Sequence, residues 1–163
     1  MQTIVGKWFP FHSEVDLHFR QIPVPAGQCT GGPPAGEYLW FTEFWGSGTA
    51  TQLGKVKLEG TLCVFGELTT PGADPPGNGT PSGYHGDFVW VAANGDRLLG
   101  TFHFTGFIGA PGTPGSALTE AVRFVDGGTG RFRFAEGEAT ARVSEADRRY
   151  TCDGWIRFGR QER

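Results

Sequence analysis

Apolar and polar side chains alternate with a period of two in one short segment after another along this chain. In residues 55–64, the clearest example, the apolar members are Val56, Leu58, Leu62 and Val64. A period of two places successive side chains on opposite faces of a β-strand, whereas a helix would repeat about every 3.6 residues. Because no segment shows a sustained helical period, the pattern predicts an all-β protein.

Glycine and proline punctuate the alternating segments. The chain of 163 residues has 27 glycines and 11 prolines, and 13% of its residues are aromatic. Disordered chains are poor in aromatic residues, so this composition favours many short strands joined by turns over a low-complexity chain. Gly46 and Gly48, for example, indicate the end of one strand. About eight strands are predicted, at residues 15–20, 37–45, 55–64, 87–93, 98–107, 117–125, 138–144 and 149–158.

The connections between these segments favour a closed barrel. Asn94-Gly95 between two apolar runs is typical of a tight hairpin, and most other connections are short. Short connections predict an up-and-down antiparallel order, and closing such a sheet into a barrel removes its exposed edges. We therefore expect residues 1–163 to form a single closed antiparallel barrel, with an N-terminal arm at residues 1–12. A long loop rich in proline and glycine is expected at residues 66–86.

The more apolar side of each strand should face the lumen of the barrel. An eight-stranded barrel is just wide enough for side chains to fill its interior or for one small ligand to bind there. Apolar pockets with few polar groups are the usual ligand sites, so a small hydrophobic molecule is the expected partner. The side chains expected to line the pocket are Trp40, Phe44, Trp90, Phe102, Phe104 and Tyr150.

Glu120 is the strongest candidate for a catalytic residue. It shares its side of the strand with Leu118, Val122 and Phe124, so the alternation places a carboxyl group in the apolar lumen. Loss of hydration there would raise its pKa and suit it to acid–base catalysis. The alternative is a glutamate at the mouth of the barrel that is hydrated or paired with an arginine.

A second group of polar residues falls on the opposite side of its strands. If the two faces were inverted, these residues would form a polar cluster in the lumen; otherwise they belong to an exterior polar face. They are Glu43, His103, Arg123 and Trp155. His85 and Asp87 could bind a metal together with His103, but so few ligands at this spacing predict no metal site.

The outer side of several strands carries more apolar residues than a monomer usually exposes. These residues are Leu39, Phe41, Trp45, Val89, Val91, Leu99 and Phe107. Large exposed apolar patches mark interaction surfaces, so we expect a homo-oligomer, either a dimer or a trimer. The alternative is that residues 8–11 of the N-terminal arm fold over this face.

The three cysteines fall on different sides of the predicted strands. Cys29 lies in a loop and Cys63 on the outer side of its strand, whereas Cys152 lies on the inner side. This placement favours a Cys29–Cys63 disulfide, with Cys152 buried in the core. A disulfide would indicate an exported protein whose leader has been removed, whereas three reduced thiols would indicate the cytoplasm, so the compartment stays open.

Three sequence motifs, taken together in their order, carry a family resemblance. They are Gly48–Lys55 (GTATQLGK), Ala92–Asp96 (AANGD) and Gly127–Phe132 (GGTGRF). Together they resemble a family of small bacterial β-barrel proteins of the allene oxide cyclase and dirigent type. The resemblance implies an eight-stranded barrel with an apolar lumen, often dimeric or trimeric, in a family that includes cyclases of reactive hydrophobic substrates. None of the family's catalytic residues can be carried over position by position, so no particular reaction is implied.

Charge and hydropathy exclude several classes of partner. The formal net charge is −3 and 19% of the residues are charged, which is too mild for a nucleic-acid-binding protein. No apolar run approaches the roughly 20 residues of a membrane-spanning helix, and no motif predicts a cofactor. Three functions remain: a barrel that binds a small hydrophobic molecule, a cyclase or isomerase that shapes such a substrate in its lumen, and a structural or secreted interaction module with a filled lumen.

Overall fold

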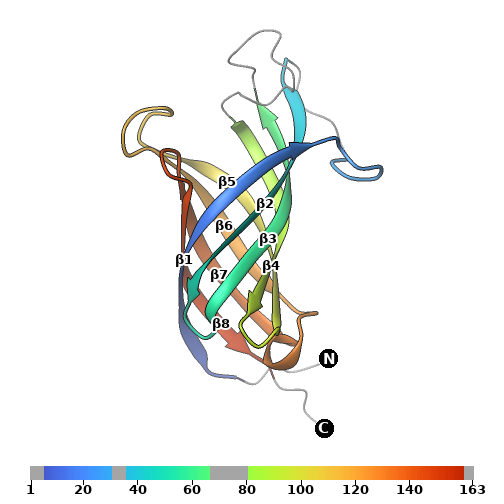
Figure 1. Ribbon diagram of the computed structural model, residues 1–163, viewed down its shortest axis with the longest axis vertical. Coiled ribbons are helices and arrows are strands. Elements are labelled where there is room, and N and C mark those ends of the chain that lie inside the picture. The colour runs from blue at the N-terminus through green and yellow to red at the C-terminus, as the bar shows by residue number, and fades with distance from the viewer. Residues whose placement is uncertain (1–5, 31–35, 67–80, 160–163) are drawn as a thin grey trace.

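The structure, a computed structural model, describes residues 6–30, 36–66 and 81–159. These residues form eight antiparallel strands that close into a single barrel, with each strand hydrogen-bonded to the next in sequence and β8 to β1 (Figure 1). The elements are β1 (Trp8–Ile22), β2 (Tyr38–Ala50), β3 (Gly54–Gly66), β4 (Pro81–Ala92), β5 (Arg97–Ile108), β6 (Ala117–Val125), the short 3-10 helix η1 (Gly130–Phe132), β7 (Ala135–Ser144) and β8 (Arg149–Phe158). The predicted all-β fold, single closed barrel and up-and-down order are confirmed.

The first strand begins earlier than the alternation predicts. Residues 8–12, expected in an N-terminal arm, pair with β8 instead, and Phe11 enters the core with 1% of its surface exposed. Pairing with β8 closes the barrel and satisfies the backbone of this segment, which a free arm would leave unpaired. The prediction of an N-terminal arm is therefore wrong for residues 8–12. The alternative in which residues 8–11 cover the outer apolar face is wrong for the same reason. Residues 1–5 lie outside the described ranges.

The fourth strand also begins earlier than expected, inside the predicted loop at residues 66–86. Residues 81–86 pair with β3, and Tyr84 continues the inward alternation of Phe88 and Trp90. That part of the loop is therefore strand, because the pairing with β3 overrides the turn-like composition of its proline and glycines. Residues 67–80, the rest of the predicted loop, lie outside the described residues.

The second strand continues through two glycines at which the sequence indicates an end. A Cβ atom at Gly46 would lie 2.1 Å from the carbonyl oxygen of Asp16, and one at Gly48 would lie 1.9 Å from that of Glu14. The backbones of β1 and β2 therefore approach too closely here for any side chain to fit between them. These glycines permit the close pairing of two strands in a barrel wall rather than ending one of them.

At one end of the barrel, β1 begins and β8 ends (Figure 1). Aromatic and aliphatic side chains fill the barrel at this end. Trp90 and Ile156 have 0% exposure, and Phe132 of η1 has 1%. The rings of Phe11 and Phe124 meet edge to face with 4.7 Å between their centres. Because such packing leaves little free volume, the barrel is closed at this end, which is called the lower end below.

The helical turn η1 contributes to this closure. Its Phe132 ring lies 5.6 Å from that of Phe158 at the end of β8, and the Arg131 side chain lies over both rings. Phe132 therefore extends the core beyond the last residues of the strands. In the described ranges, no helix has the length and apolar character needed to cross a membrane.

A β-bulge in β5 reverses the alternation near the upper end of the barrel. Thr105 is the extra residue in the pairing with β6, so Phe107 lies opposite Leu118. The Phe107 ring packs against Phe104, with 5.2 Å between the ring centres. The prediction that Phe107 lies on the outer face is therefore wrong, because one extra residue shifts a two-residue period by one.

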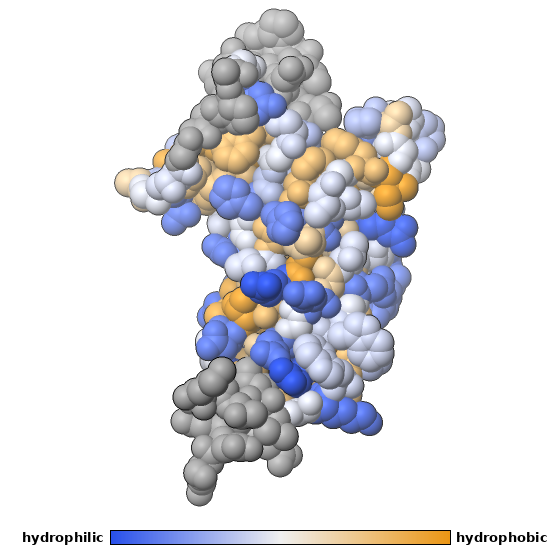
Figure 2. Space-filling model, turned by 180° about the vertical axis from the view of Figure 1, so that it is seen from behind, coloured by the Kyte–Doolittle hydropathy of each residue, from blue (hydrophilic) through white to orange (hydrophobic). Residues whose placement is uncertain are grey.

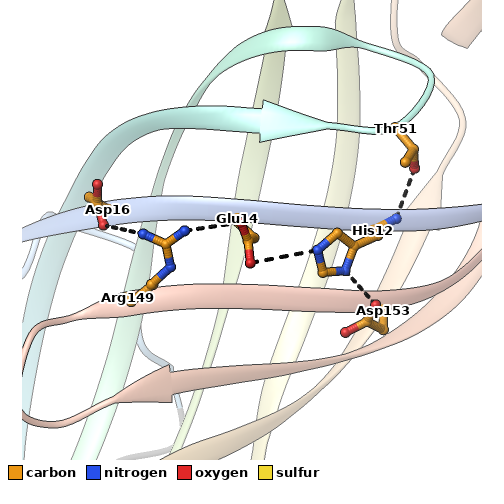
Figure 3. A network of polar contacts seen from close by, with 6 residues as sticks. All are labelled: His12, Glu14, Asp16, Thr51, Arg149 and Asp153. Carbon is orange, nitrogen blue, oxygen red and sulfur yellow. Dashed lines mark hydrogen bonds and ion pairs between the residues drawn. The ribbon is translucent and has the colours of Figure 1, made fainter.

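Charged side chains line the outer side of the seam where β1 meets β8. Arg149 contacts Glu14 and Asp16 with N–O distances of 3.0 and 3.4 Å. The His12 ring lies 2.5 Å from Asp153 in the same network (Figure 3). Exposed ion pairs of this kind contribute roughly 0–1 kcal/mol each. The network therefore favours one register of the closing strands more than it adds to the stability of the barrel.

Candidate functional site

Glu120 lies inside the barrel, where its place in the alternation puts it. The residue is on β6 and is 6% exposed, and it lies between Phe104 of β5 and Ala141 of β7 in the register of the sheet. A carboxyl group in such surroundings loses most of its hydration, which disfavours its charged form. Glu120 is therefore a buried carboxyl group rather than a hydrated one at the mouth.

Tyr84 on β4 is the hydrogen-bond partner that the structure gives to Glu120. The Tyr84 hydroxyl donates to Glu120 Oε2 over 2.6 Å. Burial raises the pKa of Glu120 from 4.5 to about 7, and the bond from Tyr84 offsets part of that rise. Burial, aided by the nearby Glu120 charge, raises the pKa of Tyr84 well above 10. Near neutral pH, Tyr84 therefore stays protonated while Glu120 populates both protonation states.

Tyr150 and Cys152 add two more polar groups to the lumen from β8. They are 4% and 0% exposed and lie on the same side of β8. Burial raises the pKa of Cys152 to about 12 and also raises the pKa of Tyr150 well above 10. Because the thiolate is the reactive form of cysteine, this buried thiol is unsuited to nucleophilic catalysis.

Two polar atoms of the lumen have no hydrogen-bond partner among the described residues, namely Ser13 Oγ and Trp90 Nε1. Ser13 lies opposite Cys152 in the pairing of β1 with β8, and the Trp90 ring is 5.9 Å from that of Tyr150. Buried polar groups nearly always have a partner, so a water molecule or the polar group of a ligand is expected here. The polar band, as we call these lumen residues below, consists of Ser13, Tyr84, Trp90, Glu120, Tyr150 and Cys152.

A small cavity adjoins two members of the polar band, Glu120 and Tyr150. Its volume is about 20 Å³, which is room for about one water molecule. The rest of its wall is apolar and consists of Leu17, Phe19, Phe44, Leu58, Leu62, Phe88, Phe102 and Val143. In this arrangement of side chains, the cavity is too small for any larger ligand.

Half-buried aromatic side chains lie at the upper end of the lumen. Phe19 and Phe104 both pack against the core without being fully buried, and the guanidinium group of Arg148 lies 5.2 Å from the Phe19 ring. Part of the rim is fixed, because Glu145 accepts hydrogen bonds from Gly112 N and Ser116 Oγ over 2.7 and 2.6 Å. Phe19 and Phe104 are therefore held by less packing than the fully buried rings of the core.

No protein family, curated protein or solved structure matches this chain. Of the features implied by the resemblance to allene oxide cyclase and dirigent barrels, the eight-stranded antiparallel barrel is present. The chemistry of the lumen therefore has to indicate the function.

The residues predicted to line a pocket all lie in the lumen but not all at the cavity. Phe44, Phe102 and Tyr150 line it together with Glu120. Trp40 is buried elsewhere in the core, and Trp90 packs between Phe11, Phe88 and Tyr150. Phe104 lies above the cavity, with its ring 5.1 Å from that of Tyr84.

The alternative polar cluster lies on the outer wall, so the two faces of the sheet are not inverted. His103, Arg123 and Trp155 border one shallow hollow over β5 to β8, whereas Glu43 lies on β2. Trp155 is 56% exposed, and Arg123 lies 3.7 Å from Glu138. Hydrophobic and hydrophilic side chains are mixed over the outer wall as seen in Figure 2. This hollow holds exposed, hydrated charges, and among the described residues no group of three or more potential metal ligands comes together.

Two of the three cysteines form a disulfide outside the barrel. Cys29 and Cys63 are joined by a disulfide, whereas Cys152 is free and buried. The bond fastens the segment after β1 to the outer wall of β3. Phe41 lies opposite Cys63 and is only 4% exposed although it points outward. This part of the predicted apolar face is therefore covered within the chain.

Tyr84 and Ser13 are the two members of the polar band that the sequence predictions miss. Tyr84 falls on the same side of its strand as Phe88 and Trp90, and Ser13 falls on the same side as Val15. The alternation of the sequence therefore indicated an inward position for both residues. The neighbouring prolines and glycines favoured a loop before β4, and the pairing partner of residues 8–12 is far away in sequence. Pairing with β8 makes residues 8–12 a strand, and pairing with β3 does the same for the segment of Tyr84.

Proposed function

We propose that this barrel binds one small, largely apolar molecule with a single polar group, which lies beside Glu120 and Tyr84. The observation that carries the proposal is the hydrogen bond between these two side chains, 2.6 Å long, in an otherwise apolar lumen. Burying a carboxyl group costs free energy, so a core with a purely structural role has no need of one. Groups with a pKa perturbed in this way gather at functional sites.

The polar band indicates which chemical group the ligand carries. With a pKa of about 7, Glu120 donates a hydrogen bond when protonated and accepts one when ionised. Ser13 Oγ and Trp90 Nε1 do not line the cavity, so a water molecule is the simpler partner for them. An oxygen-containing group such as a hydroxyl or a carbonyl matches Glu120. A charged group would be costly to bury, and a pure hydrocarbon would make no hydrogen bond to the Glu120 carboxyl group.

Space for the ligand comes from the upper end of the lumen. The existing cavity of about 20 Å³ already touches Glu120. Phe19 and Phe104 above it are only half-buried, so turning them toward solvent sacrifices less packing than moving a fully buried ring. Their displacement would join the cavity to the outside while the lower end stays closed.

A second candidate function, an isomerase or cyclase, is favoured by the pKa of Glu120. A group with a pKa near 7 can take up and release a proton at neutral pH, and a molecule bound in the enlarged cavity would lie within its reach. Glu120 would accept a proton from one position of the substrate and return it at another, so that atoms balance without a cofactor. Glu120→Gln would then abolish turnover but leave an apolar carbonyl compound bound.

The resemblance of the three sequence motifs to bacterial allene oxide cyclase and dirigent barrels is in keeping with both candidates. Proteins of that kind guide a reactive hydrophobic molecule within an apolar lumen. A barrel whose lumen is simply filled, and which acts as a structural or secreted interaction module, is the contrasting possibility that the experiment below separates from both.

The test uses the tryptophan indole N–H signals in two-dimensional NMR spectra. Trp40 and Trp90 lie in the core, whereas Trp45 and Trp155 are exposed on the outer wall and serve as an internal control. The probes are p-cresol, an apolar hydrogen-bond donor, and cyclohexanone, an apolar acceptor. We expect saturable shifts of the two core indole signals with little change in the outer ones.

A pair of matched variants tests whether the probe binds in the cavity. Val143 lines the cavity, so Val143→Leu adds a volume similar to that of the cavity itself and should weaken the binding of both probes several-fold. Val89→Leu adds the same group on the outer wall and should leave binding unchanged. Core indole signals that do not respond to millimolar probe in the folded protein would overturn the proposal in favour of a filled lumen.

A further inference from the structure

Among the described residues, one disulfide holds the segment after β1 to the barrel wall. Residues 23–30 project from the side of the barrel near its upper end (Figure 1), and residues 23–28 are exposed. The hydrogen bond that this segment forms, from Gln28 N to Pro25 O over 3.1 Å, stays within it. Cys29 is half-buried because it is bonded to Cys63 on the wall. The latch segment, as we call residues 23–30, therefore owes its position to this bond.

The backbone of Cys29 has a conformation that cysteine rarely adopts. Its φ angle is +55°, in the left-handed region that glycine enters easily and that other residues mostly avoid. The disulfide ties the Cys29 side chain to β3, so the residue keeps this conformation as long as the bond exists. Reduction would remove the restraint, and relief of the backbone strain then favours the reduced form. Strained and exposed disulfides are the ones that reductants open most easily.

Apolar side chains lie beside Cys63 on the outer wall. Phe41 is its neighbour on β2, and Ile22 of β1 follows in the same register. Phe41 is 4% exposed and Cys63 is 6% exposed, although both point away from the lumen. Cys29 lies on the outer side of Cys63, because the disulfide joins the two. Opening the bond would therefore expose the Cys63 sulfur and the side chains beside it.

We propose that the Cys29–Cys63 disulfide is a redox switch that a dithiol reductant opens while the barrel stays folded. A thiolate of the reductant attacks Sγ of Cys29, the more exposed partner, and forms a mixed disulfide. The Cys63 thiolate leaves and takes up a proton. The second thiolate of the reductant then attacks the reductant's own sulfur in the mixed disulfide, and Cys29 leaves as a thiol. Two electrons and two protons pass from the dithiol to the protein, and the reductant becomes a disulfide.

Reduction changes the outer surface and leaves the sheet in place. The eight strands close through backbone pairing in which residues 23–30 take no part. The reduced protein therefore keeps its barrel, whereas Cys29 is free to leave its left-handed conformation. It presents a thiol and an apolar side chain, Cys63 and Phe41, that the oxidised protein hides from water. Because the switch lies outside the lumen, it is independent of the ligand proposed above.

Alkylation of the folded, full-length protein by iodoacetamide tests the switch, because the three cysteines report on different events. Cys152 is 0% exposed and reacts only when the barrel opens, so it measures global unfolding. In dithiothreitol we expect Cys29 and Cys63 to react at least about 100-fold faster than Cys152. Mass spectrometry of peptides gives the rate at each cysteine. The core indole signals of Trp40 and Trp90 should keep their positions on reduction.

Cys29→Ser is the matched variant, because it leaves Cys63 as a thiol without any reductant. Its Cys63 should be alkylated at the rate found in the reduced wild type. In glutathione buffers a purely structural disulfide stays oxidised, whereas this one should be reduced in a measurable share of molecules. The inference is overturned if Cys63 reacts no faster than Cys152 in either protein, if dithiothreitol makes all three cysteines react at one rate, or if glutathione leaves the bond fully oxidised. Ligand binding is measured separately by the shifts of the core indole signals, so its failure is distinguishable from failure of the switch.

Discussion

The hydroxyl group of Tyr84 donates a 2.6 Å hydrogen bond to Glu120 inside the barrel. The two residues stand on β4 and β6, which do not pair with each other because β5 lies between them. The bond therefore links two strands through the lumen rather than through the sheet. It also leaves Glu120 with a hydrogen-bond donor in both of its protonation states, so the pair can change charge without losing its contact.

Stability should fall as the pH rises from about 4.5 to about 7 because of Glu120. Its pKa is 4.5 without burial and about 7 in the folded barrel. Between these values the unfolded chain has released the proton while the folded chain retains it, so rising pH favours unfolding; above both values the effect is constant. The loss is on the order of 3 kcal/mol. Urea unfolding of the wild type at pH 4.5, 6 and 8 measures it.

Glu120→Gln isolates this contribution from those of other carboxylates. Glutamine has the same shape and does not titrate, so the pH dependence of the variant should be flatter by the amount given above. Glu59→Gln on the outer wall is the matched control and should follow the wild type. Parallel curves for the wild type and Glu120→Gln would show that Glu120 titrates as it does in water.

Tyr84→Phe should raise the pKa of Glu120 above about 7, because the hydrogen bond from Tyr84 lowers it. Above that pH the variant buries a carboxylate without its donor, which costs about 1–3 kcal/mol of stability. Carbon-13 NMR titration of the Glu120 carboxyl group measures the pKa directly. Tyr150→Phe removes another buried hydroxyl, one that does not hydrogen-bond to Glu120, and should shift the titration of Glu120 less. An equal shift in the two variants would contradict the pairing.

Removal of the Cys29–Cys63 disulfide should destabilise the barrel by up to about 3–4 kcal/mol. The bond spans 34 residues, and a loop of that length loses substantial entropy in the unfolded chain when it is closed. The double variant Cys29→Ser/Cys63→Ser should unfold at lower denaturant concentration. Reductant should lower the midpoint of the wild type similarly and leave the double variant unchanged. A wild type that does not respond to reductant while the double variant is destabilised would point to lost side-chain packing instead.

Gly48→Ala should be among the more damaging single-methyl additions to this chain. The new Cβ would meet the carbonyl oxygen of Glu14 at 1.9 Å, and that oxygen belongs to the backbone of a paired strand. Forced separation of β1 and β2 should cost about 1–3 kcal/mol or more. Gly83→Ala on β4 has no atom within 4 Å of its new Cβ and is the matched control, with an expected change near zero. Comparable midpoints for the two variants in thermal unfolding would rule out the close approach.

The inner surface of the barrel could be predicted from sequence because its signal is local. Glu120 alternates in step with Val122 and Phe124 along β6, and this is enough to place its carboxyl group inside the barrel, whatever the neighbouring strands are. The same holds for Phe44 and Phe102, which reach the cavity. An eight-stranded barrel then follows from the number of such segments and their short connections.

The features that could not be predicted depend on pairing between distant segments. Phe11 belongs to a strand only because β8, more than a hundred residues later, pairs with it. The partner of Glu120 is missed for a similar reason, since Tyr84 lies in a segment whose composition resembles a loop. The extra residue at Thr105 leaves no mark in a single sequence, so the position of Phe107 was inverted. Local periodicity thus predicts which way a side chain points but not where a strand starts.

The bulge at Thr105 decides which way the side chains at the upper end of β5 point. Everything between the bulge and the end of β5 points the way it does because of one additional backbone unit. Deleting Thr105 would turn Phe107 outward and leave the amino-acid content of the rim otherwise the same. The direction in which Phe107 points is thus set by chain length rather than by side-chain identity, so single-residue insertions and deletions in β5 should rearrange the rim more sharply than substitutions.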